Sequence, residues 1–277
     1  MAESEFHSIL YDKSTDDKVA YITLNRPQHL NAIDTHMPLE IRAAVRQANL
    51  DPDVHCIILK GNGAGFCGGY DLDIFAASAL RGETAGSQDL SEGYEPFRDY
   101  LLMKECTDCY AALFHSYKPT IAQVHGAAAA GGSDIALSCD LVVMADDARI
   151  GYPPARVWGC PTTATCGRTA EAAAMGLVLK SVPRDELAEA VRLLTDRIKA
   201  VPVNQLWMQK QMINSTFEAQ MGAGQRLATV FDGITRNSPE GLAFQGLAAE
   251  KGFKAAVAAR DEPGRTPAYR KMWKSSL

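Results

Sequence analysis

The chain has 277 residues, of which 47% are hydrophobic and 22% are charged, and its formal net charge is −5. This composition is sufficient for one sizeable hydrophobic core, or for a core domain with a helical appendage. The mild negative charge argues against nucleic acid as the main partner, so an anionic ligand would need positive charge placed locally.

The first two thirds of the chain alternate strand-like and helix-like segments. Asp34 is placed to cap the helix that follows the first strand. Repeated strand–turn–helix units predict a mostly parallel sheet with helices outside it, followed by helices from about residue 170 onward. The polar, Gly-rich residues 76–95 are expected to form a mobile loop. Strands are predicted at 19–24, 56–60, 120–124 and 141–145, and helices at 39–48, at 97–117 and from 135.

Two runs of small residues each follow an apolar segment and open a helix. They are Phe66–Leu72 and Gly126–Asp134. The first N–H groups of a helix have no intrahelical partner, and glycine and alanine let another group approach the backbone closely. Two such helix ends aimed at one point could hold a developing oxyanion. The pair therefore indicates carbonyl activation rather than a nucleotide clamp.

Other motifs carry weaker signals. Residues 61–65 are glycine-rich, but their spacing is not G-x-G-x-x-G and no acidic residue follows at the expected distance. A phosphate loop and a nucleophile elbow are both absent from the sequence. His125 is more simply interpreted as a structural histidine at a strand end. Cys106 and Cys109 have no second pair or nearby histidine, so packing of their thiols is favoured over a metal or redox site.

The cysteines, the N-terminal residues and the lengths of the apolar runs indicate the cellular location of the protein. Seven cysteines without regular spacing are typical of reduced thiols in a cytoplasmic protein. The acidic residues 1–5 lack the apolar stretch of a signal peptide, and no window approaches ~18 uninterrupted apolar residues. We therefore expect a cytoplasmic protein with no membrane partner.

Several motifs, in this order, resemble the crotonase (enoyl-CoA hydratase/isomerase) family and cover most of the chain. Each is weak alone, and together they are specific. They are Asn25–Pro27 with Asn31–Ala32, Gly65–Leu72, Lys118–Gly126, Ala130–Asp134 with Cys139–Asp140, and Ala173–Val178.

The resemblance implies a fold and a substrate class. The expected fold is α/β, a spiral of β-β-α units (residues 1–169) with a C-terminal helical region (170–277) that serves oligomerisation and pocket closure. Family members bind acyl-CoA thioesters and usually assemble as homotrimers or dimers of trimers. The N–H groups of Tyr70 and Gly131 would form the oxyanion hole. No metal or redox cofactor is expected, because the thioester itself supplies the electron sink, and coenzyme A is part of the substrate.

Substrate-binding residues follow from the same resemblance. Residues 26–32 and 68–72 would line the CoA arm, mostly through main-chain contacts. Arg26 would contact a phosphate or form a salt bridge within its turn, and Tyr70 would cover the adenine or pantetheine. The residues concerned are Arg26, Ala32, Gly68, Gly69, Tyr70, Asp71 and Leu72.

The chain departs from the family at the catalytic carboxylates. Family hydratases typically use two glutamates to activate water; one aligns with Asp134 and the other with Pro154. Asp134 would act as general base or cap its helix. Tyr152 and Arg156 flank Pro154 and would replace a proton donor, bind a polar acyl group or simply pack. Asp71 is expected to stabilise the N-terminus of its helix.

A second departure lies at Cys166–Gly167, where roughly 20 residues expected from the family are absent, a loose boundary estimate. It is either a true deletion or an omitted segment.

Three hypotheses for function follow. The first is hydration of a 2-enoyl-CoA, with Asp134 orienting or deprotonating water and the 76–95 loop closing over the acyl group. The second is another reaction of the same enolate: isomerisation, hydrolysis or carbon–carbon cleavage. The third is a catalytically weak acyl-CoA-binding protein, which the proline at position 154 and the short junction both suggest.

Overall fold

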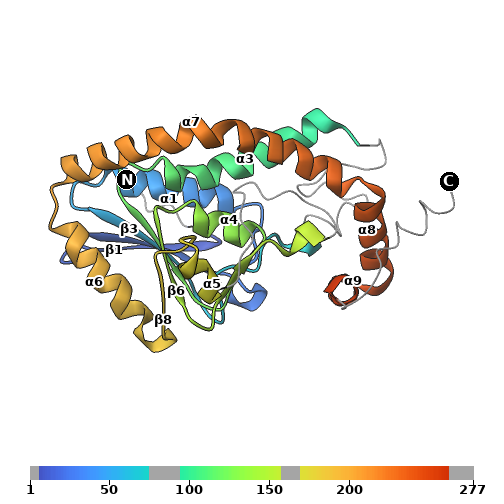
Figure 1. Ribbon diagram of the computed structural model, residues 1–277, viewed down its shortest axis with the longest axis horizontal. Helices are drawn as coiled ribbons and strands as arrows, with labels where there is room; N and C mark the ends of the chain where they lie inside the picture. Colours follow the sequence, from blue (N-terminus) through green and yellow to red (C-terminus); the bar gives the residue numbers. More distant parts are fainter. Residues whose placement is uncertain (1–5, 75–93, 157–168, 262–277) are drawn as a thin grey trace. The chain divides into compact units, whose positions relative to one another are not determined.

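The computed structural model describes residues 6–74, 94–156 and 169–261 (Figure 1). Contacts divide the chain into two compact units that alternate along the sequence. The first comprises Met1–Tyr70, Cys106–Tyr152 and Thr165–Ala223, and the second Asp71–Glu105, Pro153–Ala164 and Gly224–Leu277. From the sequence we expect a core over residues 1–169 and a C-terminal helical region over 170–277 that serves oligomerisation and pocket closure. Contacts within one chain do not test these roles, so this division stays a prediction.

A six-stranded sheet forms the centre of the first unit, in the order β1-β2-β3-β4-β6-β8. β1 pairs with β2 in the antiparallel sense, and every other neighbouring pair is parallel. A second sheet joins β5 to β7, also in parallel. The strands are β1 Ile9–Ser14, β2 Val19–Leu24, β3 Cys56–Gly61, β4 Thr120–Val124, β5 Ala127–Ala129, β6 Leu141–Ala145, β7 Arg149–Gly151 and β8 Lys180–Val182.

The predicted parallel sheet is confirmed. β3, β4 and β6 are near-continuous apolar runs, as expected of strands buried on both faces. Four strands, β1, β5, β7 and β8, were not predicted from the sequence. β1 is an edge strand whose polar residues, including Asp12 and Lys13, hide the apolar alternation. β5, β7 and β8 have only three residues each, too few for a period to show.

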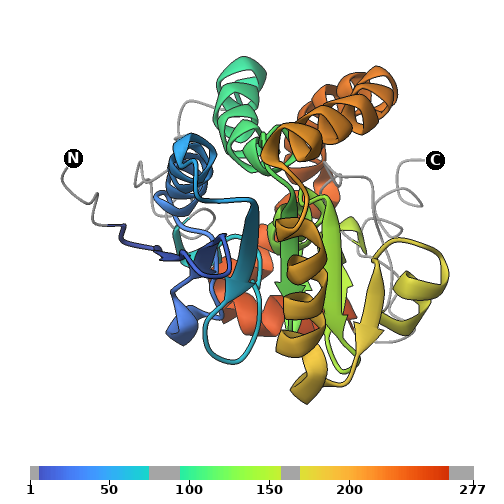
Figure 2. The same cartoon turned by 90° about the vertical axis from the view of Figure 1, so that its left-hand side faces the viewer.

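Helices cover the sheet of the first unit. α1 contacts β1 and β2, and α6 runs along β3, β4 and β6 (Figure 2). The carboxylate of Asp34 accepts the N–H groups of His36 and Met37, as predicted for a residue at the start of α1, although the N-cap residue itself is His36. The helices are α1 Met37–Leu50, α3 Pro96–Phe114, α4 Gly131–Leu137, α5 Thr169–Ala174, α6 Leu187–Lys199, α7 Val203–Arg236, α8 Pro239–Lys251 and α9 Phe253–Asp261.

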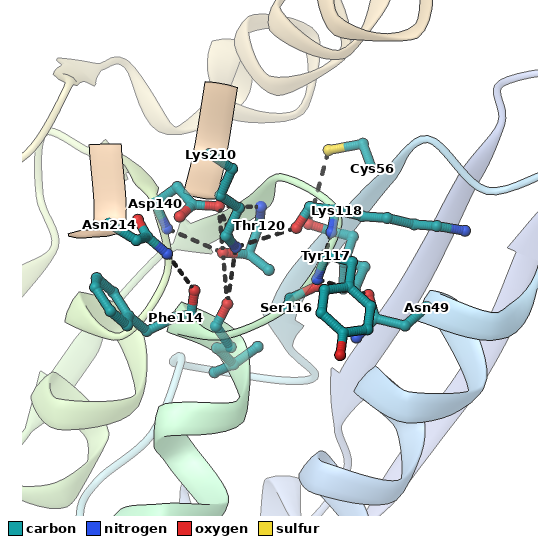
Figure 3. Close-up of polar contacts among 12 residues, drawn as sticks. Asn49, Cys56, Phe114, Ser116, Tyr117, Lys118, Thr120, Asp140, Lys210 and Asn214 are labelled. Atoms are coloured by element: carbon teal, nitrogen blue, oxygen red, sulfur yellow. Dashed lines mark hydrogen bonds and ion pairs between the residues drawn. The ribbon is translucent and has the colours of Figure 1, made fainter. Parts of the chain in front are cut away.

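A buried polar cluster fastens α7 to the N-terminal end of β4 (Figure 3). Nζ of Lys210 lies 2.8 Å from Oδ2 of Asp140 and also donates to the carbonyls of Leu113 and Lys118. The same carboxylate oxygen accepts the N–H and hydroxyl of Thr120. Burial lowers the pKa of Lys210, although the charge of Asp140 acts in the opposite direction. Each charge is thus paired and hydrogen-bonded, which buried charges require.

A second ion-pair cluster lies within the second unit. Arg236, near the end of α7, binds Asp99 of α3 at 2.8 Å and Asp232 one turn earlier at 3.0 Å. Burial alone would lower the pKa of Arg236, but the two carboxylates outweigh it and raise the pKa. Gly233 faces this cluster, since a Cβ there would lie 2.2 Å from Oδ2 of Asp99. A side chain at position 233 would therefore displace the ion pair.

Among the described residues, the structure contains no helix that is both long and apolar enough to cross a bilayer.

Candidate active site

The two small-residue turns lie side by side. Cys67 and Ala128 form a parallel bridge, in which the N–H of Cys67 donates to Ala127 at 2.8 Å and the N–H of Ala129 donates to Cys67 at 2.9 Å. The N–H of Phe66 likewise donates to His125 at 2.8 Å. These turns follow β3 and β4, which are neighbours and parallel, so they emerge at one edge of the sheet. The sequence-based pairing of the turns is therefore confirmed as a contact.

Glycines permit this close approach. A Cβ on Gly132 would lie 2.4 Å from the carbonyl oxygen of Cys67, and one on Gly69 would lie 2.9 Å from that of Ala129. Gly69 also has a φ of +100°, which side chains rarely adopt. Both positions are thus closed to any residue with a side chain unless the turns move apart.

The second turn opens α4 at Gly131, before the expected start at residue 135. Gly131 and Gly132 allow this earlier start because they fit against the first turn without a side chain. As the first residue of the helix, Gly131 has an N–H group that no carbonyl within α4 can accept. Ala130 precedes it with φ +51° and ψ −123°, a strained conformation for a residue with a Cβ.

Tyr70 ends the first turn next to Gly131. Its backbone bridges Ile33, whose N–H donates to Gly69 at 2.8 Å. A Cβ on Gly131 would lie 2.8 Å from Cε2 of Tyr70 and 2.7 Å from Cδ1 of Ile33. The two residues expected to supply the oxyanion hole are therefore neighbours, and the Tyr70 ring lies against the start of α4.

Asp134 lies in the first turn of α4 and is 5% exposed. The N-cap residue is Ala130, whose methyl side chain cannot accept a hydrogen bond from this helix end. A carboxylate in the first turn is favoured by the helix dipole whether or not it acts in catalysis. Burial is the main cause of the raised pKa values of Tyr70 and Tyr110, and the negative charge of Asp134 adds to both.

Arg26 is engaged within its own turn. Its Nε lies 3.2 Å from Oδ2 of Asp34 and its guanidinium donates to the carbonyl of Ala32. Burial raises the pKa of Asp34, but hydrogen bonds from Ser8 and Met37 and the charge of Arg26 outweigh it, so that the pKa is lowered overall. Of the two roles considered for Arg26, these contacts support the salt-bridging one.

Asn31 fixes this segment against the glycine-rich residues 61–65. Its amide nitrogen donates to the carbonyls of Asn62 and Gly65, and its oxygen accepts the N–H of Arg26. Nε2 of His125 lies 2.9 Å from the carbonyl of Gly63. The 61–65 turn is thus held by protein groups, and the interpretation of His125 as a structural histidine is supported.

The remaining predicted residues fall in several places. Gly68 is exposed and its N–H donates to Leu30, while Asp71 accepts the N–H of Asp73, as expected at a helix start. Tyr152 is half-buried. The backbone of Arg156 ends the 3-10 helix Pro153–Arg156, and its side chain lies outside the described part. The Cys166–Gly167 junction and residues 76–93 of the predicted loop also lie outside the described residues.

Sequence reasoning missed Tyr110. Its hydroxyl donates to that of Tyr70 at 3.3 Å, and its side chain is 2% exposed. The helical spacing of Cys106, Tyr110 and Leu113 indicates a buried face of α3. No signal in that pattern, however, identifies the residue that a buried hydroxyl meets 40 positions away.

Known proteins resemble this chain along most of its length. Residues 14–168 match a family model described as enoyl-CoA hydratase/isomerase. A Mycobacterium tuberculosis protein named as a probable enoyl-CoA hydratase is 30% identical over 240 residues, which span 79% of this chain and 86% of that protein. The crystal structure of an enoyl-CoA hydratase from Mycobacterium smegmatis superposes with a TM-score of 0.83 at 39% identity, covering 94% of this chain and 96% of that one. An enoyl-CoA hydratase/isomerase from Xanthobacter autotrophicus gives 0.79 at 27% identity, covering 95% and 100%.

Proposed function

The chain belongs to the enoyl-CoA hydratase/isomerase (crotonase) family, and from that premise we propose that it adds water to the double bond of a 2-enoyl-CoA thioester. The observation that carries the proposal is the contact between the two small-residue turns, which brings Tyr70 and Gly131 together beside the buried carboxylate of Asp134. The family sequence match and the structural likeness support the same class of reaction.

The backbone would stabilise the enolate. The N–H groups of Tyr70 and Gly131 donate to the thioester oxygen as negative charge develops on it, and the dipole of α4 adds to this effect. One oxyanion donor is typically worth about 2.7–4 kcal/mol in the transition state. The thioester is itself the electron sink, so we propose that no metal or redox cofactor takes part.

Asp134 would orient and deprotonate the attacking water. Its place in the first turn of α4 puts the carboxylate on the helix that begins at the oxyanion donor. Pro154 supplies neither acid nor base, so in this proposal a single carboxylate carries the proton transfers.

The CoA arm would follow the backbone of the first turn. Gly68 is exposed, whereas Ala32 and Leu72 are half-buried. These residues offer main-chain groups and small surfaces, which suits an extended pantetheine chain. Because Arg26 binds Asp34 and Ala32, we propose that it shapes this segment rather than binding a CoA phosphate.

Product analysis tests the reaction. Wild-type protein is incubated with 2-enoyl-CoA thioesters of increasing chain length, and products are identified by mass. We expect a product heavier by one water, and a large loss of its formation in Asp134→Asn. Asp147→Asn is the matched control, since Asp147 lies at the surface in an ion pair with Arg184. A product of unchanged mass would instead indicate isomerisation, and a shorter one hydrolysis or carbon–carbon cleavage.

Assembly as a homotrimer or dimer of trimers is part of the same proposal. Helix α7 exposes Met212, Ile213 and Phe217, at 72%, 57% and 47% of their surfaces, which is unusual for a helix that faces water. Native mass spectrometry tests the subunit number, and a monomer would contradict it. The location in the cytoplasm stays a prediction from the sequence.

A further inference from the structure

Two tyrosine hydroxyls meet beside the start of α4. Tyr110 of α3 donates to the hydroxyl of Tyr70 at 3.3 Å. The Tyr70 ring also lies against Gly131, because a Cβ there would come within 2.8 Å of Cε2. Tyr110 itself is 2% exposed, so packing fixes the position of its side chain. The contact therefore joins a rigid hydroxyl to the ring that flanks one candidate oxyanion donor.

Both phenols are protonated near neutral pH. Burial raises the pKa of Tyr70 well above its ordinary value, and the neighbouring Tyr110, Cys106 and Asp134 raise it further. Burial is also the main cause of the raised pKa of Tyr110, and Cys106 and Asp134 add to it. A protonated phenol donates a hydrogen bond but does not remove a proton. The tyrosine pair therefore does not replace the catalytic carboxylate that is missing at Pro154.

We propose that Tyr110 is a positioning residue whose hydroxyl holds the Tyr70 ring against Gly131, and that the held ring limits the size of the acyl group next to the thioester. This inference rests on the proposed function, since the N–H groups of Tyr70 and Gly131 place the thioester oxygen there. The ring then flanks the first carbons of the acyl chain. The substrate class is accordingly thioesters whose acyl group carries no branch next to the carbonyl.

A double-mutant cycle tests this role. The variants are Tyr70→Phe, Tyr110→Phe and the double variant, with Tyr117→Phe as control because Tyr117 is 58% exposed. kcat and KM are measured for but-2-enoyl-CoA and 2-methylbut-2-enoyl-CoA, which differ by one methyl branch next to the thioester. Loss of one hydrogen bond should lower the preference for the unbranched thioester about 3- to 10-fold in each single variant. The double variant should show the same fall, because both single changes remove the same bond.

Whether the change in preference arises in KM or in kcat distinguishes a positioning role from a purely structural one. In Tyr110→Phe we expect KM for the branched thioester to fall while kcat for the unbranched one is unchanged. An unchanged preference, or single effects that add in the double variant, overturns the inference. If the wild type converts neither thioester, the proposed hydration fails on its own. The cycle is then measured as the ratio of Kd values for butanoyl-CoA and 2-methylbutanoyl-CoA by calorimetry, and an unchanged ratio overturns the role of the pair.

Discussion

The two ends of strand β4 bury polar groups in opposite ways. At the N-terminal end, Thr120 joins Asp140 and Lys210 in a cluster of paired charges. At the C-terminal end, the chain passes through His125 and Gly126 into the turn that opens α4 at Gly131. At the N-terminal end, the polar groups are side chains that bind one another. At the C-terminal end, they are backbone groups with almost no side chain around them.

This difference separates stability from chemistry. A cluster whose donors and acceptors are paired holds elements together and leaves little to offer a ligand. N–H groups at a helix start that are flanked by glycine remain able to donate to a ligand. Their hydrogen bonds become strong when negative charge develops on the accepting atom. Ligands of open parallel sheets likewise bind beyond the carboxyl ends of the strands. Substitutions at the N-terminal end should therefore change stability, and those at the C-terminal end should change turnover.

The largest expected effect is at the N-terminal end. Lys210→Met removes a buried cation and leaves the carboxylate of Asp140, whose side chain is 20% exposed, without its charge partner. Loss of one member of a fully buried pair typically lowers the free energy of unfolding by about 3–5 kcal/mol, and the partial exposure of Asp140 puts the expected loss at the lower end of that range. Urea unfolding measures this loss, and kcat of the folded fraction should be unchanged. Lys210→Met combined with Asp140→Leu should recover much of the stability, whereas a fall in kcat at full folding would break the comparison.

At the other end, Gly132→Ala should act mainly on turnover. Its Cβ would lie 2.4 Å from the carbonyl oxygen of Cys67, so the two turns must separate. Displacing one oxyanion donor should lower kcat about 10²- to 10³-fold. Gly246→Ala is the control, because a Cβ there meets no atom within 4 Å. Steady-state kinetics with circular dichroism distinguish this result from unfolding, and normal kcat would show that the turns need not touch.

Acid should weaken the segment that supports the first turn. The pKa of Asp34 is lowered by its hydrogen bonds and by Arg26, despite burial. The unfolded chain therefore takes up this proton at higher pH, near 3.9, and the stabilising contribution is present above that value and lost as pH falls through the folded pKa. Asp34→Asn should cost about 1–2 kcal/mol at pH 7, typical of a helix-start carboxylate. In urea unfolding at pH 3 the difference from wild type should shrink, and an equal difference at both pH values would contradict this linkage.

Sequence patterns predicted the C-terminal end of β4 better than the N-terminal end. Small residues after apolar runs identify turns by local chemistry, so the turns that contain Gly69 and Gly131 could be paired from their residues alone. Lys210 and Asp140 are 70 positions apart, and neither residue type nor spacing says that they meet. Tyr110 and Tyr70 present the same difficulty at 40 positions. Short sequence motifs determine local backbone geometry, whereas contacts between side chains that are distant in the sequence depend on how helices pack.

The smallest expected effect concerns the backbone strain at Ala130. Its φ of +51° with ψ −123° suits glycine, and strain of this kind costs on the order of 1 kcal/mol. Ala130→Gly should raise stability by about 1 kcal/mol or less, since glycine also loses more conformational entropy on folding. If the strain serves to aim the N–H of Gly131, the same change should lower kcat while the melting temperature rises. Parallel measurement of Tm and kcat decides this, because a gain in both would show that the strain contributes nothing to the chemistry at this end of β4.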